Sequence, residues 1–412
     1  IYSRDADSYF LPASNTKLLT TAAVLSQLGA DFKIRTSVYG EGGANILNRL
    51  TLVGKGDPSL TKQELENLTK QLQEQGITRI KQLIVDNSYF EDAGIYPSWE
   101  WEDVYAYYGV AINSVILEEN AVVLRIFPQE LGKKVKLEWS DYLAAKQWQV
   151  TNQAITAPDD TPYNIKITGE LGKPTLYIRG ELAKNTEVDT WGLAILDPNQ
   201  YMLDKFSAIL EQAGIRVDSQ AVAKSAKQNL GKQLAYIDSP SLIELVKRTN
   251  LESNNLFAEV LLQILKQELN AENHIAALTE SLKKLGVEPE TYQLVDGSGL
   301  SRHNLITNRA IVQTLQHMAN TPLGEIYRDS LPIAAKSGTL RRRFKNTQAE
   351  AIVKAKTGTL TGVSALSGYI NPPQFQPLVF SILLNNADIS VQQQREAIDS
   401  IVVLLMDLEN CF

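Results

Sequence analysis

The chain has 412 residues, of which 44% are hydrophobic and 21% are charged, and its net charge is −7. This length is too great for one compact core, so two or three domains are expected. An acidic chain whose longest basic run is the three arginines at 341–343 is a poor partner for nucleic acid, and its only cysteine, Cys411, excludes an internal disulfide and a cysteine-based metal site.

The chain contains no stretch of about eighteen consecutive apolar residues, so no membrane span is expected. Its first residues, Ile1 to Asp5, do not resemble a signal peptide, and we expect a processed or trimmed form. Only three histidines are present, which leaves few candidates for a serine–histidine triad and favours a different base.

The first predicted element is a helix over residues 14–28. Leu18, Ala22 and Leu25 recur at spacings of three and four residues, and Gly29 is a natural stop. The segment Ser14-Asn15-Thr16-Lys17 lies at the start of this helix, where free backbone N–H groups and the positive end of the helix dipole favour an oxyanion.

Ser14 and Lys17 are three residues apart, so on a helix their side chains project from one face. A serine hydroxyl is a weak nucleophile at neutral pH, and a lysine whose pKa is lowered can accept its proton. Taken alone, the pattern more often belongs to an ordinary helix start with a solvated lysine.

Apolar periodicity predicts the remaining elements along the chain. Strands are expected at 34–39, 50–53, 80–85, 122–127, 135–139, 175–178, 364–370 and 378–384, and helices at 62–75, 200–213, 242–269, 274–285, 311–318 and 391–408. The middle of the chain is therefore β-rich. The C-terminal part is helical and closes with strand, strand and helix, the two strands pairing antiparallel.

Two further short motifs follow in the helical part of the chain. Ser253-Asn254-Asn255 fits S-x-N within the predicted helix at 242–269, and Lys356-Thr357-Gly358 fits K-T-G beside a predicted strand. Alone, the first is also typical of a helix cap or break, and the second of a turn. Together with S-x-x-K, in this order, they are typical of penicillin-binding proteins and class A β-lactamases.

These residue types supply what acyl transfer needs: a nucleophile, a base, a proton route and an oxyanion site. We expect Ser14 to attack the carbonyl, Lys17 to accept the proton, and Ser253 to relay it to the leaving amine. Asn255 is expected to bind a backbone amide of the substrate.

The charge of Lys356 should lower the pKa of Lys17 and attract a substrate carboxylate that Thr357 helps to hold. Gly358 should leave room for a substrate along the strand edge. The backbone N–H groups of Ser14 and Thr359 are expected to form the oxyanion hole.

A near copy of the third motif competes with it. Lys336-Ser337-Gly338 also fits the pattern, because serine often replaces threonine there. The Lys356 copy is followed by two alternating apolar runs, which supply the strand pair that a sheet-edge site needs, whereas a basic and polar stretch follows Lys336. We therefore assign the role to Lys356.

With the three motifs placed, the chain resembles the class C low-molecular-mass penicillin-binding proteins, the D-alanyl-D-alanine carboxypeptidase/endopeptidase family. The likeness covers nearly the whole length and rests on the three motifs, on a tryptophan pair within 97–103, and on the strings at 11–17, 54–60 and 296–302.

The resemblance implies a multidomain α/β (α+β) fold. A β-lactamase/transpeptidase-like catalytic domain, with an antiparallel sheet flanked by helices, would be split by a long β-rich insertion that forms two smaller domains. We predict a catalytic domain at 1–37 and 232–412, an inserted domain II at 38–114 and 166–231, and an inserted β-rich domain III at 115–165. The family has at least one more strand and helix before the nucleophile, so part of the catalytic sheet is expected to be missing here.

The resemblance also implies an activity: hydrolysis of the terminal D-Ala-D-Ala bond of peptidoglycan stem peptides, and of cross-links, through an acyl-serine that β-lactams trap. It implies no metal or organic cofactor, and a periplasmic or otherwise extracytoplasmic location. Asp103 is implied to meet the free amine of the substrate's diamino acid, although a solvated loop residue is an equal interpretation, and Arg302 is a further substrate-binding candidate. The oligomeric state is open.

Two other functions stay open at this stage. A β-lactamase or esterase of the same fold would use the same residues. A non-catalytic scaffold that binds cell-wall peptides is disfavoured, because no catalytic position is substituted.

Overall fold

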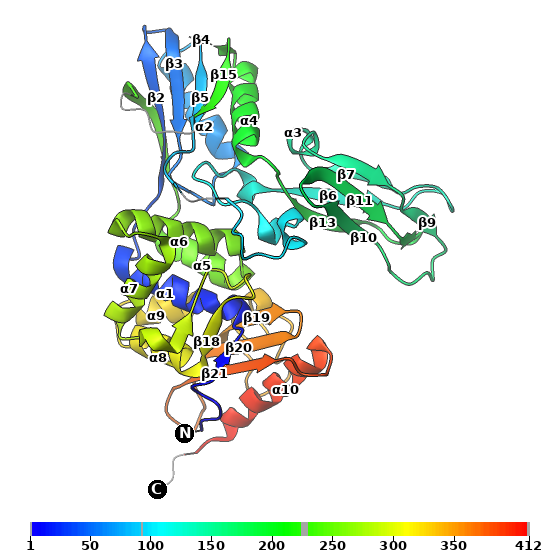
Figure 1. Cartoon of the computed structure of the whole chain (residues 1–412), viewed down its shortest axis with the longest axis vertical. Coiled ribbons are helices and arrows are strands. Elements are labelled where there is room, and N and C mark those ends of the chain that lie inside the picture. Colours follow the sequence, from blue (N-terminus) through cyan, green and yellow to red (C-terminus); the bar gives the residue numbers. More distant parts are fainter. Residues whose placement is uncertain (1, 92–93, 224–229, 410–412) are drawn as a thin grey trace. The chain divides into compact units, whose positions relative to one another are not determined.

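The structure is a computed structural model of the chain and describes residues 2–91, 94–223 and 230–409. It forms two compact units (Figure 1). Residues 1–33 and 240–412 make one, the split unit, and residues 34–239 make the other, the inserted unit. Cys411 lies outside the described residues. In the described part of the chain, no helix combines the length and the apolar character that crossing a membrane requires.

The three sequence motifs lie in the split unit, which contains a three-stranded antiparallel sheet in the order β19-β20-β21 (Figure 1). Its strands are β19 (Lys354–Leu360), β20 (Val363–Ile370) and β21 (Leu378–Asn385). Because side chains alternate along a strand, the two faces differ. Leu366 joins a core with Ile398 of α10 (Val391–Leu404), whereas the hydroxyl of the next residue, Ser367, accepts a 2.7 Å bond from Asn15. The sheet therefore has α10 on one face and the start of the chain on the other.

Helix α1 (Thr16–Leu28) is the centre of the helical part of this unit. Its residues 16–25 are all buried, and it packs against α5, α6, α7 and α8. A helix that is apolar on most of its circumference has to be covered on all sides, which fixes its first turn firmly. The other helices and short strands of the split unit are α5 (Leu242–Glu252), α6 (Asn255–Leu269), α7 (His274–Leu285), α8 (Asn308–Ala319), α9 (Gly324–Asp329), β1 (Tyr9–Phe10), β17 (Tyr292–Gln293) and β18 (Leu305–Thr307), with 3-10 turns η1 (Ala13–Asn15), η5 (Pro289–Thr291), η6 (Gly338–Leu340) and η7 (Leu405–Asp407).

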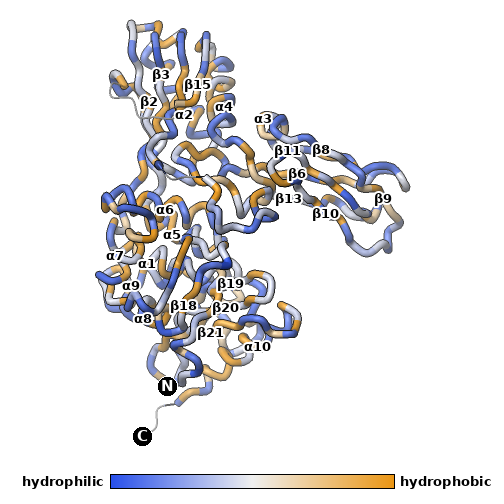
Figure 2. Tube along the Cα trace, viewed as in Figure 1, coloured by the Kyte–Doolittle hydropathy of each residue, from blue (hydrophilic) through white to orange (hydrophobic). Residues whose placement is uncertain are grey.

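The inserted unit is built on a mixed sheet against which two helices pack. Strands β14, β4, β3, β2 and β16 follow one another across the sheet, β5 pairs with β3 and with β15, and α2 and α4 lie against them. Hydrophobic and hydrophilic residues are interspersed along these elements (Figure 2). Their bounds are β2 (Arg35–Gly42), β3 (Ile46–Val53), α2 (Lys62–Glu74), β4 (Arg79–Ile80), β5 (Leu83–Asp86), α4 (Pro198–Gln212), β14 (Arg216–Val217), β15 (Gln220–Ala223) and β16 (Lys232–Asp238).

The remaining strands of the inserted unit form three small sheets, with β6 between β13 and β7, β11 between β10 and β8, and β12 beside β9. The elements are η2 (Asp103–Tyr105), η3 (Tyr107–Gly109), η4 (Glu118–Asn120), β6 (Ala121–Phe127), β7 (Lys136–Trp139), α3 (Tyr142–Ala145), β8 (Gln149–Asn152), β9 (Ile155–Ala157), β10 (Lys166–Glu170), β11 (Lys173–Arg179), β12 (Glu181–Ala183) and β13 (Asp189–Ala194).

These pairings bear on the predicted domain boundaries. Strands after residue 165 pair with strands before it, so the predicted boundary at 165/166 does not coincide with an edge of a sheet. Strand β16 pairs with β2, which places residues 232–238 with the inserted unit and not with the catalytic domain. A division of the insertion into domains II and III stays a prediction.

Most predicted elements are present, some with shifted ends, and two of them are divided. The helix predicted at 242–269 is two helices, α5 and α6, that are separated at Ser253 and Asn254. The strand predicted at 80–85 is divided into β4 and β5, which pair with different parts of β3.

Candidate active site

Ser14 and Lys17 lie side by side at the start of α1. Ser14 is on the 3-10 turn η1 and Lys17 is in the first turn of the helix. Lys17 Nζ lies 3.0 Å from Ser14 Oγ. The helical spacing thus brings the two groups within reach of a direct proton transfer.

The amine of Lys17 has two further neighbours, both oxygen atoms. It donates to Asn255 Oδ1 at 2.6 Å and to the Ser298 carbonyl at 2.7 Å. These two oxygens can only accept, so they occupy both N–H groups of a neutral amine. The lone pair is then left for the third neighbour, the Ser14 hydroxyl, which is the orientation a general base requires.

The surroundings of Lys17 favour this neutral form. The side chain is completely buried, and burial lowers its pKa to about 7, although the carboxylates of Glu259 and Asp296 partly oppose the shift. At neutral pH the amine can therefore act as a base.

Ser253 and Asn255 reach the site because the chain breaks between α5 and α6. Ser253 has a left-handed backbone, with φ of 60°, and ends α5, while the Asn254 side chain caps α6 by accepting from Phe257 N at 3.1 Å. The motif is therefore a helix break as well as a set of site residues. The break turns Ser253 toward Lys356, and Asn255 begins α6 beside Lys17.

Lys356 is buried on β19 and connects this strand to Ser253. Its Nζ donates to Ser253 Oγ at 2.8 Å and to the Thr357 carbonyl at 2.9 Å. Burial, together with the charge of Lys17, holds the pKa of Lys356 well below its usual range. We expected the charge of Lys356 to lower the pKa of Lys17. The main cause of the lowered Lys17 pKa is instead the burial of its own side chain.

The competing copy at 336–338 has a different setting. Lys336 is exposed and forms an ion pair with Glu350 at 2.9 Å, and the Ser337 hydroxyl accepts from Ile333 N at 3.0 Å. The geometry therefore supports the assignment of the third motif to Lys356. The residue after the copy, Thr339, contacts the Thr357 hydroxyl at 2.8 Å, so this segment borders the site.

Thr357, Gly358 and Thr359 follow Lys356 on the edge strand of the sheet. A Cβ at Gly358 would lie 2.7 Å from the Pro12 carbonyl oxygen, closer than real contacts allow. Gly358 thus permits the segment before Ser14 to approach β19. This differs from the expectation that the glycine leaves room for substrate.

The two weaker candidates lie in different units. Arg302 follows the string at 296–301 in the split unit and donates to the Thr361 carbonyl at 3.0 Å. Asp103 is a half-buried residue of η2 in the inserted unit, where burial raises the pKa of its carboxyl despite a hydrogen bond with Tyr108. The structure brings the five catalytic candidates together with Thr357, Gly358, Thr359 and Arg302 in one unit, and Asp103 is not among them.

Sequence reasoning missed a pair of buried acids beneath Lys17. Glu259 accepts from the Gly297 and Ser298 backbone N–H groups, the latter at 2.6 Å. Asp296 accepts from Gly299 N at 2.8 Å. Together the two acids hold the loop whose Ser298 carbonyl binds Lys17. A glutamate in the middle of an otherwise apolar helical run was the available signal.

Asp296 also influences Glu259. Burial and the neighbouring Asp296 raise the pKa of Glu259. Because the Glu259 carboxylate raises the pKa of Lys17, protonation of Glu259 affects the base as well as the loop.

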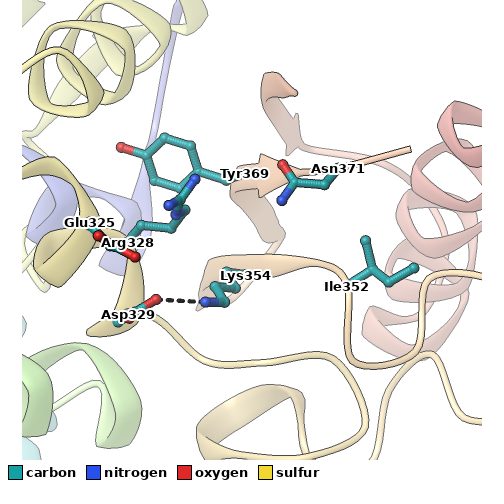
Figure 3. A pocket seen from close by; sticks show the side chains of 7 residues that line it. All are labelled: Glu325, Arg328, Asp329, Ile352, Lys354, Tyr369 and Asn371. Carbon is teal, nitrogen blue, oxygen red and sulfur yellow. Dashed lines mark hydrogen bonds and ion pairs between the residues drawn. The ribbon is translucent and has the colours of Figure 1, made fainter. Parts of the chain in front are cut away.

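A cleft of about 460 Å³ opens at the site, and Ser14, Ser253, Thr357 and Thr359 line it. A separate cavity of about 180 Å³ has entirely different lining residues (Figure 3). It contains an ion pair between Lys354 and Asp329, at 2.6 Å, and the side chain of Arg328 (Figure 3). Among the described residues, no group of three His, Cys, Asp or Glu could hold a metal ion.

Comparison with known proteins gives one consistent result. The sequence pattern of the family described as "D-Ala-D-Ala carboxypeptidase 3 (S13) family" matches residues 1–408. A penicillin-sensitive carboxypeptidase A of Dictyostelium discoideum is 32% identical over 98% of this chain and 83% of its own length. A D-alanyl-D-alanine carboxypeptidase of an Actinomadura species is 31% identical over 93% of this chain and 75% of its own.

The fold has a match among solved structures. The crystal structure of penicillin binding protein 4 (dacB) from Haemophilus influenzae superimposes with a TM-score of 0.86, at 24% identity, over 99% of this chain and 92% of that one. The predicted multidomain fold is confirmed.

Proposed function

Because this chain belongs to the D-Ala-D-Ala carboxypeptidase 3 (S13) family, we propose that it cleaves the terminal D-Ala-D-Ala bond of peptidoglycan stem peptides through an acyl-serine on Ser14. Membership makes the chain a serine-type D,D-peptidase. The assignment of roles to individual residues is the proposal. The observation that carries it is the position of Lys17 Nζ, with two oxygen acceptors on its N–H groups and Ser14 Oγ at 3.0 Å.

Acylation begins when Ser14 Oγ attacks the carbonyl of the scissile bond and the neutral amine of Lys17 takes its proton. The backbone N–H groups of Ser14 and Thr359 stabilise the oxyanion. As the bond to the leaving amine breaks, Ser253 passes to that amine the proton that Lys17 had accepted, so Lys17 becomes neutral again. Lys356 holds the Ser253 hydroxyl at 2.8 Å. A water molecule then attacks the acyl-serine, with Lys17 again as the base, and frees the enzyme.

Substrate binding uses the edge of β19. Thr357 and Thr359 hold the terminal carboxylate, and a bound carboxylate favours the charged form of Lys356. Asn255 can bind a substrate amide while its Oδ1 holds Lys17. Asp103 is proposed to bind the free amine of the diamino acid, and Arg302 is a further substrate-binding proposal.

The proposed chemistry also suggests inhibitors, further substrates and a location for the protein. A β-lactam carbonyl has the geometry of the substrate amide, and one relative is named penicillin-sensitive, so β-lactams are proposed as covalent inhibitors. Peptidoglycan cross-links end in the same type of bond and are proposed as further substrates. Since peptidoglycan lies outside the cytoplasmic membrane, the protein is proposed to act there.

Labelled penicillin tests the assignment. Mass spectrometry of the intact protein and its peptides should find one adduct, on Ser14, and none in the Ser14→Ala variant. A label on another residue would disprove the assignment. Rapid release of hydrolysed penicillin would favour a β-lactamase, and a folded protein that forms no adduct would favour a non-catalytic peptide-binding role.

A further inference from the structure

One end of the cleft is lined by arginines that the proposed mechanism does not use. The segment after Thr339 contributes Arg341, Arg342 and Arg343, and α10 contributes Arg395. Among the described residues that line the cleft, none is acidic. This end is therefore strongly basic, in a chain whose net charge is −7.

The four arginines are not equivalent. Arg343 is mostly buried, forms an ion pair with Asp399 of α10, and stacks on the Phe344 ring, so it fixes the segment in place. Arg341 and Arg342 are exposed. Arg395 is also exposed and donates to the Thr359 hydroxyl at 3.2 Å.

The position of these arginines assigns them to the leaving side of the cleft. In the proposed mechanism the carboxylate beside the broken bond belongs to the leaving group and lies at Thr357 and Thr359. Thr357 contacts Thr339, two residues before Arg341, and Thr359 contacts Arg395. A leaving group that extends past this first carboxylate reaches the arginines.

The cleft as a whole, from Ser14 to the arginines, has room for more than a single leaving alanine. The cleft volume of about 460 Å³ falls within the range of roughly 300–1,000 Å³ typical of sites for larger ligands. The planar guanidinium group of arginine matches a carboxylate with two parallel hydrogen bonds. Both size and charge thus fit a longer, anionic leaving group.

We propose that Arg341, Arg342 and Arg395 form a second anion subsite, which binds a further carboxylate on the leaving half of the peptide. This inference rests on the proposed function, because that function defines the leaving side. The subsite makes the enzyme select a leaving peptide with a second carboxylate over a neutral one of the same shape.

A matched pair of peptides tests the subsite. One ends in D-Ala-D-Glu and the other in D-Ala-D-Gln, so they differ only in the charge of the leaving side chain. We expect kcat/KM to be roughly five- to tenfold higher for the D-Glu peptide, the effect of a few partly exposed charged hydrogen bonds. Higher ionic strength should reduce this preference.

In the double variant Arg341→Ala/Arg342→Ala, which keeps only Arg395 of the subsite, most of the preference should be lost. Arg328→Ala is the matched control, because Arg328 belongs to the same unit and lines only the other cavity (Figure 3), and it should keep the preference. Equal kcat/KM values for the two peptides, or an unchanged preference in the double variant, would overturn the proposal.

Equilibrium binding separates this proposal from the proposed function. The Ser14→Ala protein should bind the D-Glu peptide more tightly than the D-Gln peptide by a similar factor, with no turnover required. Absence of hydrolysis and of a penicillin adduct would refute the function, whereas equal binding of the two peptides would refute the subsite.

Discussion

The pH dependence of Ser14 acylation tests the central feature of the site, the lowered pKa of Lys17. Only the neutral amine can accept the proton of Ser14, so lowering the pH should slow acylation by protonating Lys17. The rate should rise with pH through a midpoint near 7 and then level off. Below about pH 6, each further pH unit should cost roughly a factor of ten.

The size of the effect follows from the burial of the side chain. With the ordinary lysine pKa of 10.5, roughly one amine in 3,000 would be neutral at pH 7, and with a pKa of about 7 the neutral fraction is about one half. This difference corresponds to about 5 kcal/mol between the charged and neutral forms. This free-energy difference is larger than the usual net contribution of a single hydrogen bond.

Stopped-flow acylation by a fluorescent penicillin, from pH 5 to 9, measures this profile. The Lys17→Met variant should lose about two to four orders of magnitude in rate and should no longer depend on pH in this range. Circular dichroism would verify that the variant is folded. A rate that is constant from pH 5 to 9, or that still rises tenfold per pH unit at pH 9, would refute the assignment of Lys17 as a base with a pKa near 7.

Two further predictions concern stability. The folded pKa of Lys17 lies below its unfolded value, so unfolding takes up a proton between pH 7 and 10.5, and the free energy of unfolding should rise with pH there by up to about 1.4 kcal/mol per unit. The lowered pKa of Lys356 acts in the same direction. Urea unfolding at several pH values should therefore show a smaller rise of the unfolding free energy with pH in Lys356→Met, and an identical rise would contradict a buried amine of lowered pKa. Gly299→Ala should destabilise the fold and abolish acylation, because a Cβ there would lie 1.9 Å from the Ala13 carbonyl oxygen. Gly214→Ala is the control, because Gly214 has the same φ of +81° and a Cβ there would meet nothing within 4 Å. It should lose only the ~1–2 kcal/mol of unfolding free energy that a left-handed backbone costs. Equal losses of unfolding free energy in the two variants would refute the clash at Gly299.

The sequence predicted the local geometry around Ser14. Ser14 and Lys17 are close in sequence, and a helical spacing of three residues is enough to place them on one face. The strand pair after Lys356 was equally predictable, because its alternating pattern reflects the two faces of the sheet. Leu366 packs with α10 on one face, and Ser367 contacts Asn15 on the other.

The parts that depend on distant contacts were not predictable from local patterns. The left-handed backbone of Ser253, which divides one predicted helix into two, lies within an uninterrupted helical periodicity. The close neighbour of Gly358 is Pro12, on a segment more than 300 residues earlier in the sequence. The apolar run around Glu259 indicates that it is buried but not what it binds, since its partners lie on the loop at 297–298. Only the folded arrangement defines such contacts.

The base itself depends on these distant contacts. An isolated helix with the sequence of α1 would expose Lys17 to water, and its pKa would remain near 10.5. The groups that contact its amine from this distant part of the chain are Asn255 at the start of α6 and the Ser298 carbonyl, and both follow the insertion in sequence. The two segments of the split unit must therefore pack together before Ser14 has a base, so reactivity at Ser14 should report the folded split unit and not the local helix.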